Sequence, residues 1–262
     1  GFEQISKVLQ QKAHETVLEI NLNAVVHNLN YYRSRLKPET QIMVMVKAFS
    51  YGSGSFEISN MLQFHHVDYL AVAYADEGVE LRKGGITLPI MVMNPEEQSF
   101  ETMVNYKLEP EIYSFRVLQQ FSDLLKRKSE ELQGARFPIH LKIDTGMHRL
   151  GFDEQDINEL VVRIRNNRYL KIAGIFSHLA ASDEAMHDGF TKQQAEQFKK
   201  MADQIASHFS YKICQHLLNS AGIIRFPEFQ FDMVRLGIGL HGIAASPHEQ
   251  KHLQMVATLK TT

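Results

Sequence analysis

The sequence predicts an α/β protein folded as a (β/α)8 barrel of the TIM type. Short apolar runs alternate with longer amphipathic stretches, and polar residues recur directly after the apolar runs. Repeated strand-then-helix order produces parallel strands joined by right-handed crossovers. A chain of 262 residues is long enough for one such barrel. An open doubly wound sheet would show the same alternation, but no clear G-x-G-x-x-G follows an early strand.

Nine segments have the character of strands, one more than the barrel needs. We place the first, 17–21, outside the barrel. The other eight are 42–46, 69–73, 90–93, 109–113, 139–143, 172–177, 213–218 and 231–236. Stretches with helical periodicity separate most of them, including 22–36, 114–128, 154–165 and 192–208. Four methionines, Met43, Met45, Met91 and Met93, alternate along two of these strands and are expected to be barrel packing and not a metal-binding cluster.

Composition excludes several classes of function. The chain has 28 Lys and Arg against 30 Asp and Glu, so its net charge of −2 favours neither nucleic acid nor an anionic membrane as a partner. The single cysteine, Cys214, excludes an intrachain disulfide and an all-cysteine zinc site. The longest apolar run, 69–75, is far shorter than a membrane span, and no signal core occurs early in the chain. A cytoplasmic location is therefore expected.

Polar residues follow several strands at the ends where a barrel enzyme carries its active site. They are Lys47, Lys142, Asp144, Arg149, His178, Asn219, Ser220 and Arg235. Lys47 is the most informative, because a lysine at the end of a buried strand has a lowered pKa and its neutral amine can form a Schiff base. The alternative is a lysine that simply extends from the barrel mouth into water.

Three glycine- and serine-containing loops follow strands and can direct backbone N–H groups at an anion. They are 51–55, 219–222 and 235–239. Each alone could be an ordinary turn between a strand and a helix. Together they favour a phosphorylated ligand, because barrel enzymes often hold a phosphate after their last two strands.

Three separated motifs resemble the signatures of the alanine racemases, in order and spacing over nearly all of 16–245. They read VKAFSYGSG from Val46, KIDTGMHRLG from Lys142, and NSA from Asn219 followed by FDMVRLGI from Phe231. The resemblance implies the barrel domain of a fold-type III pyridoxal-phosphate enzyme.

The resemblance also implies roles for individual residues. Lys47 would bind pyridoxal 5'-phosphate covalently and act as the base for the D-enantiomer. Tyr51, Asn219, Ser220 and the N–H groups of Gly237 and Ile238 would bind the cofactor around its phosphate.

The remaining implied roles concern the ring and the substrate. Arg235 would face the pyridine nitrogen, and His178 would pack near the ring and support Arg235. Arg149 would contact the phenolic oxygen and the substrate carboxylate. Lys142 matches a lysine that is carbamylated in some members. No metal is expected, because the H-E-x-x-H pattern at 248–252 has no evident third ligand.

The implied activity is pyridoxal-phosphate-dependent racemisation of L- and D-alanine for peptidoglycan synthesis, in a homodimer. The second base in the family is a tyrosine from a following β domain, supplied across the dimer. We therefore expect a lead-in helix or linker at 1–15, the cofactor-binding barrel at 16–245 and the start of a truncated β domain at 246–262. On this expectation the 262 residues alone are inactive, and they could come from a fusion with a peptidoglycan ligase.

Two alternatives stay open. One is a non-catalytic barrel that binds pyridoxal phosphate. The other is a different fold-type III reaction such as decarboxylation, although those enzymes favour an acidic partner at the ring nitrogen where Arg235 stands here.

Overall fold

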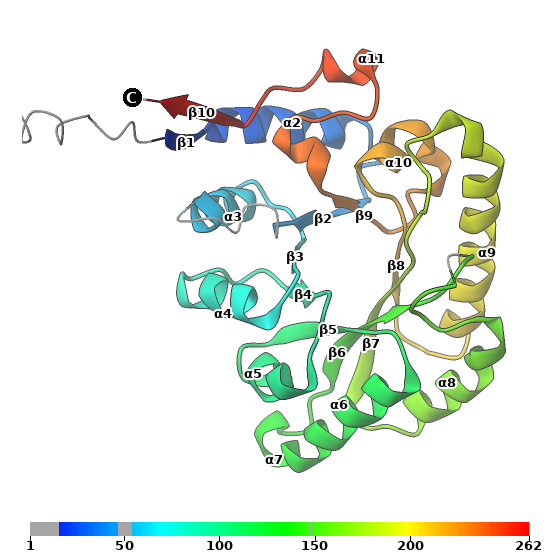
Figure 1. Ribbon diagram of the computed structural model, residues 1–262. Helices are drawn as coiled ribbons and strands as arrows, with labels where there is room; N and C mark the ends of the chain where they lie inside the picture. The colour runs from blue at the N-terminus through cyan, green and yellow to red at the C-terminus, as the bar shows by residue number, and fades with distance from the viewer. Residues whose placement is uncertain (1–15, 47–53, 147, 262) are drawn as a thin grey trace, which may run out of the picture.

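The computed structural model describes residues 16–46, 54–146 and 148–261 (Figure 1). Eight parallel strands, β2 to β9, close into a barrel in chain order, with β9 paired to β2. They are β2 (Gln41–Met45), β3 (Tyr69–Val72), β4 (Ile90–Val92), β5 (Leu108–Ile112), β6 (Phe137–Lys142), β7 (Leu170–Phe176), β8 (Cys214–His216) and β9 (Met233–Leu236). The predicted (β/α)8 barrel is confirmed.

Helices surround the barrel, and most of them cover its outer face (Figure 1). They are α2 (Leu22–Ser34), α3 (Gly54–Phe64), α4 (Ala75–Lys83), α5 (Phe100–Asn105), α6 (Phe115–Arg127), α7 (Ser129–Leu132), α8 (Ile157–Arg165), α9 (Asp188–Ala206), α10 (Ser220–Arg225) and α11 (Pro247–Gln250). Helix α6 shows why such segments form helices. Ser114 caps its first turn by accepting a hydrogen bond from the Val117 amide, and Phe121 and Leu125 are buried on its inner face. None of the helices among the described residues is both long and apolar enough to cross a bilayer.

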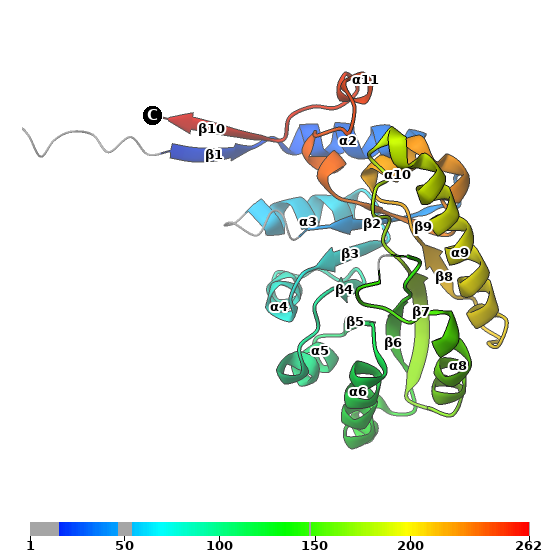
Figure 2. The same ribbon diagram turned by 45° about the vertical axis from the view of Figure 1, so that its right-hand side comes forward.

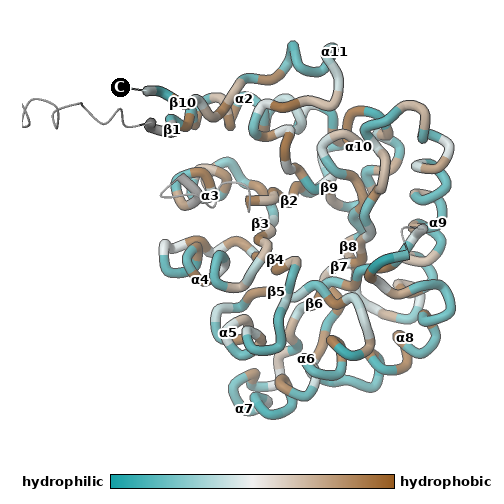
Figure 3. Tube along the Cα trace, viewed as in Figure 1, coloured by the Kyte–Doolittle hydropathy of each residue, from teal (hydrophilic) through white to brown (hydrophobic). Residues whose placement is uncertain are grey.

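Two apolar clusters fill the molecule. The larger lies between the strands and the helices, and the tube in Figure 3 shows hydrophobic colour along β2 to β4. The smaller consists of Met43, Ala71, Met91, Phe176 and Met233, whose side chains point into the barrel. The expectation that the strand methionines are barrel packing is confirmed for Met43 and Met91, while Met45 and Met93 pack against the cluster and also line a cavity at the barrel mouth.

A two-stranded ribbon lies outside the barrel (Figure 2). Strand β1 (Thr16–Ile20) pairs antiparallel with β10 (Ala257–Thr261) in a register that places Thr16 opposite Thr261. The position of β1 outside the barrel matches the prediction from 17–21. Strand β10 was not predicted, because all five of its residues are exposed and it presents no apolar side to identify. The lead-in helix expected at 1–15 falls outside the described residues.

Candidate active site

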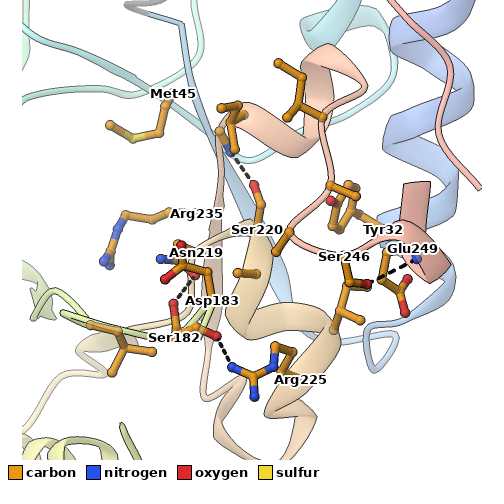
Figure 4. Close-up of a pocket in the computed structure, with 18 of the residues that line it drawn as sticks. Tyr32, Met45, Ser182, Asp183, Asn219, Ser220, Arg225, Arg235, Ser246 and Glu249 are labelled. Atoms are coloured by element: carbon orange, nitrogen blue, oxygen red, sulfur yellow. Dashed lines mark hydrogen bonds between the residues drawn. The ribbon is translucent and has the colours of Figure 1, made fainter. Parts of the chain in front are cut away.

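A cavity of about 660 Å³ opens at the C-terminal ends of the strands (Figure 4). Its wall contains six of the residues that the sequence singled out: His178, Asn219, Ser220, Arg235, Gly237 and Ile238. A smaller cavity of about 100 Å³ is lined by Lys142, Asp144, Arg149 and again His178. Because His178 lines both, the two cavities adjoin, and the barrel brings most of the predicted rim residues together.

Two predicted site residues, Lys47 and Tyr51, lie outside the described residues. The nearest described part of that segment is the end of β2, and Met45, two residues before Lys47, lines the larger cavity. The last residue of β2 therefore borders the cavity.

Ser220 joins two segments of the cavity wall. Its Oγ accepts hydrogen bonds from the amides of Gly237 at 3.0 Å and Gly239 at 3.2 Å, which ties the start of α10 to the loop after β9. A hydroxyl that accepts two N–H groups still has its own hydrogen to donate. Glycine is required at 239, since a β-carbon there would overlap the Tyr32 hydroxyl. The Ser220 hydroxyl hydrogen is therefore a donor that this wall can offer to an anion, while the Gly237 and Gly239 amides are used in bonds to Ser220. The phosphate contacts expected of the Gly237 and Ile238 amides stay a prediction.

Asn219 has a structural task at the same place. Its side-chain oxygen caps α10 by accepting from the Gly222 amide at 2.9 Å, and it also accepts from the Ser182 hydroxyl at 3.0 Å. These bonds fix the start of the helix that carries Ser220. The role of Asn219 toward a cofactor stays a prediction.

Arg235 extends from β9 and is only 5% exposed. Its guanidinium donates to the carbonyls of Ser177, His216 and Leu217 and to the Nδ1 atom of His216. Burial lowers the pKa of Arg235 to about 10, partly opposed by the charge of Glu111. The side chain is therefore a protonated, firmly held donor at neutral pH.

His216 is a site residue that the sequence did not single out. It lies on β8, stacks on Phe176 with ring centroids 5.0 Å apart, and its Nδ1 is 3.0 Å from Nη1 of Arg235. Burial and the neighbouring charge of Arg235 hold the pKa of His216 well below its usual range, so the ring is neutral. Its signal in the sequence was weak, since one histidine inside an apolar strand looks like a core residue. The expected support of Arg235 by His178 stays a prediction.

Lys142 forms an ion pair with another residue that was missed. Its Nζ lies 3.6 Å from Oε1 of Glu111, which is buried on β5. Carbamylation would replace the lysine cation with an anion facing this carboxylate, so it would require the pair to rearrange. The carbamylation of Lys142 stays a prediction.

The loop that carries Arg149 is closed by hydrogen bonds near Lys142. Oδ1 of Asp144 accepts from the amides of Gly146 and His148, and the Phe152 amide donates to the Lys142 carbonyl at 3.0 Å. Gly151 has φ +128° and lies against this backbone, so only glycine fits without strain. Arg149 is exposed beside the smaller cavity, free to contact a ligand that enters there.

The H-E-x-x-H pattern contributes packing. The ring of His252 stacks on Tyr31, and its carbonyl lies 2.8 Å from Nε2 of His27. Across the described part of the chain, no group of three or more His, Cys, Asp or Glu side chains is placed to hold a metal ion.

The comparison with protein families decides the relationship. Residues 20–245 match the model of the alanine racemase N-terminal domain. The chain belongs to the alanine racemase family. It is 35% identical over 238 residues to an alanine racemase of Synechocystis, which covers 88% of this chain and 61% of that protein. The chain thus spans about three fifths of the curated relatives it matches.

Solved structures agree with this membership. The alanine racemase of Clostridium difficile 630 superposes with a TM-score of 0.83 at 33% identity, covering 94% of this chain and 64% of that chain. A Bartonella henselae alanine racemase structure with covalently bound pyridoxal phosphate has a TM-score of 0.79 at 25% identity, covering 93% and 65%.

Proposed function

We propose that this chain binds pyridoxal 5'-phosphate and forms the barrel part of an alanine racemase active site. The observation that carries the proposal is Arg235, a buried donor that is protonated at neutral pH and lies on the same wall as the Ser220 hydroxyl. An arginine there is the residue that sets this family's chemistry apart from decarboxylation, which favours an acidic group at the ring nitrogen.

The residues present fit this cofactor. The Ser220 hydroxyl hydrogen and the Ile238 amide of the loop after β9 suit its phosphate, whereas the Gly237 amide, which donates to Ser220, would have to shift to join them. Arg235 can donate a hydrogen bond to the pyridine nitrogen but cannot readily give up a proton, so it would keep that nitrogen unprotonated. When bound, pyridoxal phosphate withdraws electrons from the α-carbon of an attached amino acid. Holding its ring nitrogen unprotonated limits this withdrawal and should disfavour transamination.

Three further side chains complete the proposed roles in this chain. Lys47 would hold the cofactor covalently and carry the α-proton on Nζ for the D-enantiomer. Arg149, exposed beside the smaller cavity, would bind the substrate carboxylate with its planar fork. Tyr51 would contact the phosphate together with Ser220.

Racemisation also needs a base on the opposite face of the α-carbon. The tyrosine that lines the described cavity is Tyr32, and burial raises its pKa, which makes it a poor proton carrier at neutral pH. We propose that the second base is supplied across a homodimer from outside residues 1–262. The 262 residues alone are then expected to bind the cofactor but racemise alanine very slowly, and the complete enzyme would supply D-alanine for peptidoglycan.

The decisive experiment locates the attached cofactor. The purified chain is incubated with pyridoxal phosphate, reduced with sodium borohydride and mapped by peptide mass spectrometry. We expect one stable adduct, on Lys47, and its loss in Lys47→Ala. The matched control is Lys83→Ala, which removes an exposed lysine at the end of α4. An adduct on another lysine, or none, would contradict the proposal.

A racemase assay of the same chain tests the missing base. Rapid alanine racemisation by the 262 residues would refute the proposal that the second base lies elsewhere. No activity in the full-length protein, with the adduct intact, would instead favour the non-catalytic cofactor-binding barrel.

A further inference from the structure

Below the cavity, inside the barrel, lies a set of three buried polar side chains, of which only His216 has been described so far. Glu109 of β5, His140 of β6 and His216 of β8 all point inward, and each is less than 10% exposed. The two histidine rings meet edge to face with centroids 5.7 Å apart. This set connects to the cavity through Arg235, which donates to His216.

The hydrogen bond with Arg235 determines which nitrogen of His216 carries the proton. An arginine N–H can only donate, so Nδ1 of His216 must accept with its lone pair. His216 is neutral, because burial and Arg235 keep its pKa low. Its one proton must therefore be on Nε2. That atom is buried and has no hydrogen-bond partner among the described residues.

His140 has the complementary arrangement. Its Nε2 lies 2.9 Å from Oε1 of Glu109, a carboxylate oxygen that also accepts from the Tyr69 hydroxyl at 2.8 Å. Nε2 of His140 is therefore the donor. In the neutral ring this leaves a lone pair on Nδ1, which is also buried and without a partner in the described part of the chain.

The two unpartnered nitrogens converge on one glycine. Gly174 of β7 pairs with His140 on one side and Cys214 on the other. A β-carbon at Gly174 would lie 2.6 Å from Nδ1 of His140 and 3.0 Å from Nε2 of His216. The absence of a side chain at Gly174 thus lets the two nitrogens face the same small space. Nε2 of His216 faces it with a proton and Nδ1 of His140 with a lone pair.

We infer that His140 is a positioning residue for Arg235. Glu109 orients His140, the lone pair of His140 favours the proton on Nε2 of His216, and the free Nδ1 of His216 then accepts from Arg235. With a donor in place of this lone pair, the His216 proton would favour Nδ1, where it would oppose the Arg235 N–H group. Which nitrogens of His140 and His216 carry protons depends on this chain alone. The consequence for the pyridine nitrogen rests on the proposed function.

Two substitutions of His140 separate the two nitrogens. The asparagine amide is short and can place its oxygen where Nδ1 was, whereas the longer glutamine amide reaches the position of Nε2. His140→Asn therefore keeps an acceptor toward His216. His140→Gln keeps the contact with Glu109 but removes that acceptor. Gln215→Met is a matched control, since Gln215 lies on the same strand as His216 and bonds outward to Asp203.

The measurement is ¹⁵N NMR of the cofactor-free chain with labelled histidine, and the His216 signals are assigned by their absence in His216→Asn. In the wild type, His140→Asn and Gln215→Met we expect a protonated-type shift for Nε2 and an unprotonated-type shift for Nδ1. In His140→Gln we expect these shifts to average or exchange. Identical His216 shifts in the Asn and Gln variants would overturn the inference, as would a proton on Nδ1 in the wild type.

A second variant covers the case in which the glutamine chain does not fold. Gly174→Ala would separate the two rings and should perturb the same His216 shifts, while an unchanged spectrum would also overturn the inference. These shifts are measured without cofactor, so they test the inference even if the chain fails to bind pyridoxal phosphate. In the loaded chain, His140→Gln should then raise transamination relative to His140→Asn.

Discussion

The two sides of the barrel interior are equally buried and chemically opposite. Around β2 to β4 the inward residues include Met43, Ala71 and Met91, none of them exposed. On β6 and β8 the corresponding positions hold His140 and His216, also at 0% exposure. The strands are alike in direction and pairing, so the barrel backbone does not require either chemistry. One side is thus filled by apolar packing, and the other by side chains that make directed hydrogen bonds to Glu109 and Arg235.

Each side is stabilised in its own way. Methionine is flexible and fills irregular space without needing a specific partner. A buried polar group needs its partner in place, and it costs free energy when the partner is lost. Barrel interiors are ordinarily filled by branched apolar residues, so a charged interior marks a site under functional constraint.

The largest effect should come from the polar side, at Arg235. Arg235→Met would leave three carbonyls and Nδ1 of His216 without a donor. Relief from burying a cation offsets part of this loss, and we expect the free energy of unfolding to fall by about 3–5 kcal/mol. Urea unfolding at pH 7 measures it. An unchanged or higher stability would mean that the polar side lowers stability for the sake of function.

On the methionine side, the loss of stability should depend only on the side-chain volume that is removed. Met91→Ala would leave a cavity inside the barrel and lower the free energy of unfolding by about 2–5 kcal/mol. Met43→Leu, which keeps the volume, should cost less than about 1.5 kcal/mol. Met43 is level with Arg235 in the register of β2 and β9, which makes it a close control. Equal losses in both variants would show that the methionines have specific partners.

The smallest expected effect is the change in the free energy of unfolding per pH unit, which the histidines of the polar side should cause and the methionines should not. The pKa of His216 lies below its ordinary value of 6.5 in the folded chain, so below about pH 6.5 the unfolded state binds a proton that the native state does not. The free energy of unfolding should therefore decrease as the pH is lowered below about 6.5, by up to about 1.4 kcal/mol per pH unit for this histidine. His241, with a pKa lowered to about 4, acts in the same direction over pH 6.5 to 4.

Urea unfolding between pH 7 and 5 checks this dependence. His216→Asn should flatten it, and Met43→Leu should keep the wild-type slope. A slope unchanged in His216→Asn would show that other groups carry the pH dependence.

Much of the architecture was readable from the sequence. The eight barrel strands and the helices α2, α6, α8 and α9 followed from apolar runs and helical periodicity, and β1 was placed outside the barrel correctly. Strand β10 was not predicted, because it has no apolar face and forms a strand only through its pairing with β1. The predicted rim residues that the structure describes line two adjoining cavities, because polar groups after buried strands share one edge of a barrel.

The sequence by itself determined the barrel, its rim and the family motifs, because these depend on local periodicity and on short contiguous patterns. Only the tertiary structure decided the partners inside the barrel: Glu111 with Lys142, Glu109 with His140, and His216 with Arg235. Parallel strands are buried on both faces, so their sequence does not show which side chain points inward. Which inward groups meet depends on the register between strands and on closure of the barrel, and both are set by contacts between residues far apart in the chain.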